Sequence, residues 1–140
     1  MVRRRNLMCL AAVLLVSLLT VIGRPQTTPV LANTITGPYA ALLAASADLG
    51  PAGGNRAQVT AALRGTSNPA RLVQWAAGHD LAVRWQGGAN WAVVEGPPSA
   101  LAEAFGVVVH DYRGRRGQVF YASPQQPQVP DAVRGEVTEL

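Results

Sequence analysis

Side chains able to carry out catalysis or hold a metal ion are scarce in this sequence. It contains one cysteine, Cys9, and two histidines, His79 and His110. Two histidines are too few for a metal centre, and Cys9 lies within an apolar N-terminal run, so a folded domain after that run has no thiolate. We therefore expect no metal site, no cofactor and no thiol nucleophile.

Serine, histidine and aspartate residues occur that could in principle form a catalytic triad, but none lies in the sequence pattern that a nucleophilic serine requires. Ser99, His110 and Asp111 lack the strand–turn–helix arrangement that exposes a nucleophilic serine. Ser67 follows Gly65-Thr66 between a short predicted strand and a proline-started helix, where an ordinary turn is expected. We predict no catalytic residue.

The first 32 residues have the pattern of an export signal. The basic start MVRRRN is followed by an uncharged, mainly apolar run over residues 7–22. Export signals carry about 7–15 apolar residues after a basic start, whereas a membrane span needs about 20. Val30-Leu31-Ala32 is a plausible cleavage site, so we expect cleavage after Ala32. The mature protein is then secreted or extracellular, or anchored in the cell envelope if the leader is retained.

The charge of the remaining chain is close to neutral. All twelve basic residues are arginines, and four of them precede residue 32. Eight arginines then face eight acidic residues. A nucleic-acid-binding domain needs a basic footprint, so this balance argues against a nucleic-acid partner. Membrane contact is expected only through an uncleaved leader.

The middle of the chain alternates between strand and helix patterns. Residues 33–55 predict a flexible lead-in, and residues 58–64 predict a strand. Asn68-Pro69 starts a helix, because Asn favours the N-cap and Pro the first helical position. Residues 81–86 and 90–96 form a predicted hairpin, across which Trp85 and Trp91 are expected to meet.

A second predicted helix and further strands follow. Leu101, Ala104 and Phe105 form the apolar stripe of a helix that begins after Gly96-Pro97-Pro98. Residues 107–112 and 119–122 predict further strands. The order β-α-β-β-α-β predicts an α+β, ferredoxin-like sandwich over residues 56–122, in which one antiparallel sheet carries both helices on one face. A signal helix precedes it, and residues 123–140 form an extended C-terminal tail.

Several stretches resemble a known family and occur in its order. They are QVTAALR, LAEAFGVVVHDYR, FYASPQQPQVP and AVRGEVTEL. The most specific is Ala104-Phe105-Gly106-Val107 followed by residues 110–112, and the second is Val129-Pro130 followed by an amphipathic stretch. From about residue 48 to residue 140 the chain resembles the activation propeptide of the sedolisin, or kumamolisin-type, serine-carboxyl peptidases.

This resemblance implies a regulatory function. The module is expected to be an intramolecular chaperone and inhibitor of a sedolisin-like catalytic domain, in cis in a full-length precursor or in trans. Its C-terminal linker is expected to cross the active-site cleft and to be cleaved on acid activation. The family's Ser, Glu and Asp catalytic residues and its calcium site belong to a following domain that this sequence does not contain. The chain alone is therefore not expected to be an enzyme, whereas a full-length precursor would be a serine-type endopeptidase.

Two groups of residues are the candidate sites. Aromatic side chains are enriched at interfaces, and arginines that meet carboxylates lose that attraction when acid protonates the carboxylates. Prolines keep a chain extended, as a peptidase cleft requires. The candidate docking residues are Tyr112, Arg113, Arg115, Arg116, Phe120 and Tyr121, and the candidate cleft-crossing linker is Ser123, Pro124, Gln125, Gln126, Pro127, Gln128, Val129 and Pro130.

Other interpretations remain open from the sequence alone. The chain fits a free-standing secreted binding domain, or an inactive remnant of a truncated peptidase gene. The arginine segment fits a solvated hairpin turn, and the proline-rich segment fits a disordered terminus. An RNA-recognition-like module shares the order of elements, but the leader and the neutral charge oppose it.

Overall fold

The computed structural model describes residues 34–140. The predicted signal over residues 1–32 and its cleavage site at Ala32 lie outside these residues. Helices and strands alternate along the described chain in the order α1 (Gly37–Ala44), β1 (Ala47–Pro51), β2 (Ala57–Leu63), α2 (Ala70–Ala77), β3 (Ala82–Trp85), β4 (Trp91–Gly96), α3 (Pro98–Phe105), β5 (His110–Arg113), β6 (Val119–Ala122), the 3-10 helix η1 (Asp131–Val133) and β7 (Val137–Glu139). No helix in this part of the chain is long and apolar enough to cross a membrane.

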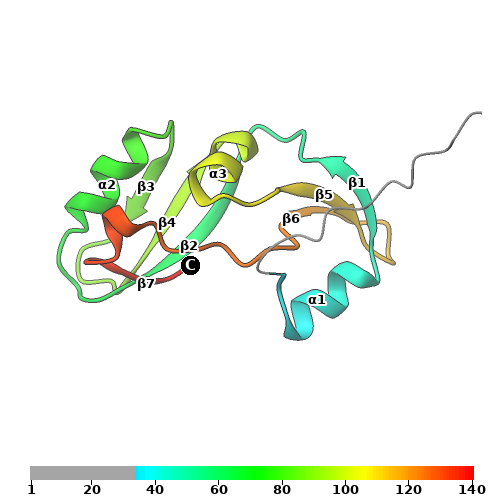
Figure 1. Ribbon diagram of the computed structural model, residues 1–140, viewed down its shortest axis with the longest axis horizontal. Coiled ribbons are helices and arrows are strands. Elements are labelled where there is room, and N and C mark those ends of the chain that lie inside the picture. Colours follow the sequence, from blue (N-terminus) through cyan, green and yellow to red (C-terminus); the bar gives the residue numbers. More distant parts are fainter. Residues whose placement is uncertain (1–33) are drawn as a thin grey trace, which may run out of the picture.

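The larger half of the molecule is an antiparallel four-stranded sheet, in the order β3-β4-β2-β7, with α2 and α3 packed on one face (Figure 1). The rings of Trp75 on α2 and Phe105 on α3 lie 5.4 Å apart, so the two helices share that face. The α+β class and the placement of both helices on one face of an antiparallel sheet are confirmed. The buried core lies between helices and sheet and consists of Ala57, Ala61, Leu63, Leu72, Ala76, Leu81, Ala92, Val94, Leu101, Phe105, Val133 and Val137.

The fourth strand of this sheet is not the expected one. The sequence analysis predicts residues 107–112 as a strand of a single sheet, but β7 takes the edge beside β2, where Leu63 aligns with Val137 and Ala62 with Glu139. The physical reason is burial: β7 brings the fully buried Val137 to the core. Strand β5, with the polar sequence HDYR, pairs elsewhere.

The smaller half is an antiparallel three-stranded sheet in the order β1-β5-β6. Figure 1 shows it beside the larger sheet, with α1 next to β1. Residues 34–55, predicted as a flexible lead-in, contain both α1 and β1. Strand β5 therefore pairs with β1, which precedes the predicted sandwich, and with β6, which lies at its end.

The C-terminal segment is extended only in its first part. Residues 123–130 form no helix or strand, but η1 and β7 follow, and Val133 and Val137 are each 1% exposed. The carboxylate of Glu136 accepts hydrogen bonds from the backbone N–H groups of Arg71 and Leu72, at 3.2 and 3.0 Å. The expectation of an extended tail is thus corrected for residues 131–140, because their apolar side chains complete the core.

Candidate docking surfaces

The open face of the four-stranded sheet carries an exposed tryptophan. Trp85 aligns with Ala92, and neighbouring side chains on a strand point to opposite faces, so Trp85 packs toward the helices while Trp91 points away. Trp91 is 49% exposed. The expected contact between the two tryptophans across the hairpin is therefore wrong. The same face carries the half-buried Val93 of β4 and the exposed Thr60 of β2.

A buried carboxylate organises one end of this open face. Glu95 is only 7% exposed, and its two oxygens meet Arg56 Nη1 at 3.4 Å and Arg84 Nε at 3.0 Å. Arg84 also donates to the side-chain oxygen of Gln58 at 3.3 Å. The cluster holds Arg56 and Arg84 along the sheet surface, with their charge partly offset by Glu95. It gives the open face a polar margin beside Trp91 and Val93.

The predicted arginine turn is exposed and lies between β5 and β6. Gly114 and Gln118 close it through a backbone hydrogen bond of 2.9 Å, and Gly117 adopts a positive φ of 81° that favours glycine. Arg113, Arg115 and Arg116 form no ion pair with any acidic residue within residues 34–140. Their charges face solvent and are available to a partner.

The predicted aromatic anchors have different surroundings. Tyr112 is only 4% exposed and stacks on Phe120, with ring centroids 6.0 Å apart. It therefore holds the three-stranded sheet together instead of offering an interface. Phe120 is half-buried, whereas Tyr121 is 39% exposed. Tyr121 is the aromatic member of the predicted docking set with the largest accessible surface.

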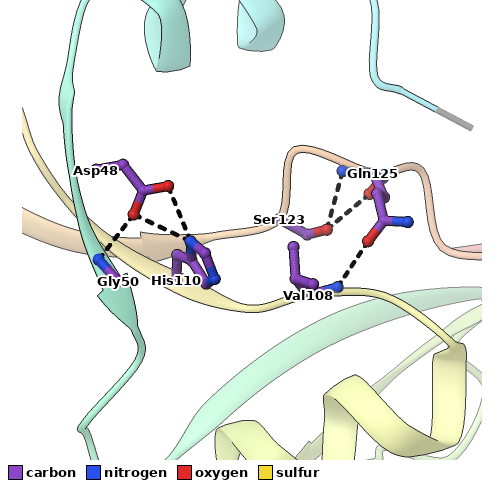
Figure 2. A network of polar contacts seen from close by, with 6 residues as sticks. All are labelled: Asp48, Gly50, Val108, His110, Ser123 and Gln125. Carbon is purple, nitrogen blue, oxygen red and sulfur yellow. Dashed lines mark hydrogen bonds and ion pairs between the residues drawn. The ribbon is translucent and has the colours of Figure 1, made fainter. Parts of the chain in front are cut away.

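A contact between a histidine and a carboxylate joins β1 to β5. His110 Nδ1 lies 2.9 and 3.0 Å from the two carboxylate oxygens of Asp48, which also accepts the N–H of Gly50 at 2.8 Å (Figure 2). The hydrogen bond from His110, and then that from Gly50, hold the pKa of Asp48 below its ordinary 3.8. Burial, and secondarily the charge of Asp48, raise the pKa of Tyr112.

The predicted linker is tied to the fold near its start. The side-chain oxygen of Gln125 accepts the backbone N–H of Val108 at 2.7 Å, and Ser123 Oγ and the backbone of Gln125 hydrogen-bond to each other at 3.0 Å (Figure 2). Ile35 N–H also donates to the carbonyl of Pro124 at 2.9 Å. Gln125, predicted as part of the cleft-crossing linker, is only 9% exposed. Farther along the linker candidate, Gln126 Nε2 donates to the carbonyl of Leu140 at 3.4 Å, and the carbonyl of Val129 accepts from Arg134 Nε at 3.4 Å.

An apolar groove of about 520 Å³ lies between the two halves. Val59 and Thr60 of β2 and Phe105 of α3 line its inner side, and Tyr39 of α1 and Tyr121 of β6 line its outer side. None of its lining side chains is charged. No side chain of α1 is buried, although this helix is almost wholly apolar, so α1 extends the apolar surface beyond the groove.

The histidine and aspartate considered in the sequence for catalysis make other contacts in the structure. No cluster of three or more His, Cys, Asp or Glu side chains that could hold a metal ion occurs within residues 34–140. His110 is in hydrogen-bond contact with the carboxylate of Asp48, and the carboxylate of Asp111 accepts the N–H of Gly53 at 3.0 Å.

Comparison with known proteins agrees with this architecture. The family model of the pro-kumamolisin activation domain matches residues 54–139, which include the whole four-stranded sheet and both of its helices. A search of curated proteins gives no match. Because the family model covers more than half of the chain, the protein belongs to the pro-kumamolisin activation domain family, the propeptides of sedolisin-like peptidases.

Proposed function

We propose that this chain is an exported inhibitor and folding assistant of a sedolisin-like catalytic domain. The observation that carries the proposal is the family match over residues 54–139, which coincides with a folded unit that has its own core. A unit with its own core can present a preformed surface to an unfinished or active peptidase. Preformed surfaces lose less entropy on binding than segments that fold on their partner.

The proposed anchor is the open face of the four-stranded sheet. Trp91 supplies a large exposed apolar side chain, and tryptophan is the residue type most enriched among binding hot spots. Val93 adds apolar area, and the Arg56–Glu95–Arg84 cluster forms a polar margin. An apolar centre with a polar rim is the usual anatomy of a protein interface.

The arginine turn is proposed to speed the encounter. Arg113, Arg115 and Arg116 are unpaired within the described chain and would meet carboxylates on the peptidase. Charge attraction of this kind raises association rates more than it raises final affinity. Acid that protonates those carboxylates would weaken it, which supports release at low pH.

Cleavage within residues 126–130 is the proposed step that makes release irreversible. A cut there would separate η1 and β7, with the buried Val133 and Val137 and the helix-capping Glu136, from the rest of the core. The severed module would lose one edge of its sheet and part of its core. We expect it to unfold and not to rebind.

The direct test mixes the purified full chain with a sedolisin catalytic domain near neutral pH. Inhibition of peptide hydrolysis and a higher refolding yield of the catalytic domain are the expected results. An absence of binding, inhibition and refolding gain would dismiss the proposal and favour a free-standing secreted binding domain or an inactive remnant.

A further inference from the structure

One edge of β2 is left open inside the apolar groove. Leu63 N–H donates to Asn90 at the start of β4, and Gln58 N–H donates to the hydroxyl of Tyr121 on the other side, at 3.1 Å. Main-chain groups alternate between the two edges of a strand, so the N–H and C=O of Thr60 also face away from β4. Strand β7 aligns only with Ala62 and Leu63. On the side away from β4, the N–H and C=O of Thr60 therefore face no aligned strand of the described residues.

The hydroxyl of Tyr121 occupies the place of a strand carbonyl. Its oxygen accepts the N–H of Gln58, which a neighbouring strand would otherwise bind through its own C=O. Tyr121 is 39% exposed, so its side chain has room to turn away. An incoming strand can replace this single contact with a ladder of main-chain hydrogen bonds.

The line of β7 leads directly into the groove. Strand β7 runs antiparallel to β2, from Leu63 toward Ala62, and its next residue, Leu140, lines the groove together with Gln58 and Thr60. Figure 1 places the C-terminus between the two halves, beside β2. Any polypeptide joined to Leu140 and continuing as a strand would run along the open edge.

We propose that this groove accepts one added β-strand, formed by the extended polypeptide that follows Leu140 in a peptidase precursor. The strand would align with Thr60 and Gln58 in continuation of β7, and its inward side chains would be small and apolar because the side chains that line the groove are uncharged. This choice of occupant rests on the proposed function, whereas the pairing on β2 does not.

The first experiment needs no peptidase, so its failure is separable from failure of the proposed function. The full chain is titrated with the labelled peptide SVTVQ, and amide hydrogen exchange is followed by NMR. Binding should slow exchange at Thr60 at least about tenfold, since a main-chain hydrogen bond now protects it. The control is the same peptide N-methylated at the amides that would face β2. Equal binding of both peptides, or binding of neither, would overturn the strand pairing.

Tyr121→Phe sharpens the same measurement. Loss of the hydroxyl frees the N–H of Gln58 for the peptide, so affinity should rise by about 2–12-fold, the worth of one hydrogen bond. Tyr39→Phe is the matched control, because Tyr39 lines the groove but makes no hydrogen bond through its hydroxyl to residues 34–140. An unchanged affinity for Tyr121→Phe would show that the peptide does not reach Gln58.

The second experiment identifies the occupant. The chain is extended after Leu140 by the same SVTVQ sequence. We expect the extension to protect the Thr60 amide without added peptide and to abolish binding of the free peptide. If the extended chain still binds free peptide with the original affinity, or if protection appears only with dimerisation on a sizing column, the segment after Leu140 is not the occupant and this assignment is wrong.

Discussion

The two halves of the molecule are stabilised in different ways. Every member of the buried core cluster lies in the four-stranded half or in the C-terminal segment that completes it, whereas Tyr112 is the buried hydrophobic residue of the three-stranded half. The smaller half relies on main-chain pairing, the Tyr112–Phe120 stack and the Asp48–His110 pair. One half is thus built around an apolar core, whereas the other contains Asp48, the carboxylate whose pKa is lowered.

Matched valine-to-alanine substitutions should give the largest difference in stability between the two halves. Val137→Ala removes a fully buried side chain from β7 and should lower the free energy of unfolding by about 1.5–3 kcal/mol. Val119→Ala, in β6, removes a side chain that is 56% exposed and should cost less than about 0.5 kcal/mol. Urea unfolding of both variants measures the difference. Equal losses would show that the C-terminal segment is not part of the core.

Loss of the contact between the tail and the α3–β5 connection should have the next largest effect on stability. Gln125→Ala leaves the N–H of Val108 without its acceptor, at a cost of about 1–3 kcal/mol. Gln128→Ala, at an exposed position of the same segment, should stay within about 0.5 kcal/mol of the parent. Thermal unfolding compares the two. An equally mild effect of both changes would mean that Gln125 does not pin the tail.

Capping of α2 gives a smaller expected effect. Glu136→Ala removes the acceptor of two N–H groups at the start of the helix and should cost about 0.5–2 kcal/mol. Glu139→Ala, on the adjacent strand and exposed, is the control for loss of one negative charge. Denaturant unfolding distinguishes them, and a larger loss for Glu139→Ala would contradict the capping role.

The pH-dependent pair should have the smallest effect, confined to acid. Because the folded-state pKa of Asp48 lies below 3.8, the pair stabilises the protein above about pH 4 and loses this contribution as the pH falls through that lowered pKa. In His110→Asn the pKa of Asp48 should rise toward 3.8, as NMR titration of its carboxyl group would show. His79→Asn is the control, since His79 bonds the carbonyl of Trp75. A pKa that stays low without His110 would assign the shift to Gly50 instead.

The sequence predicts the local elements well, because they depend on local patterns. Alternation in residues 58–64 and 81–86 and the stripe of Leu101 and Phe105 correspond to β2, β3 and α3. Proline and glycine at the ends of α3 correspond to its observed limits, and Gly106 has the left-handed conformation that ends such a helix. Both helices lie on the predicted face of the sheet.

The predictions that fail concern contacts between residues that are distant in the chain. Nothing local indicates that Val137 will fill the edge of β2 ahead of the strand that begins at His110. Glu136 caps a helix whose first N–H partner is 65 residues away, which no spacing rule predicts. The predicted meeting of Trp85 and Trp91 depends on the hairpin register, which aligns Trp85 with Ala92 and which the sequence does not reveal. Nothing local distinguishes Gln125 from the other polar residues of the tail.

Calorimetric titration of a sedolisin catalytic domain with Trp91→Thr and Val119→Thr tests the central claim most directly. Both variants replace an exposed apolar strand residue, one on the proposed docking face and one near the arginine turn. We predict that Trp91→Thr weakens binding about 30-fold or more, as loss of a hot-spot side chain does, while Val119→Thr binds like the parent. Parent-like binding of Trp91→Thr, or no binding by the parent chain, would contradict the account.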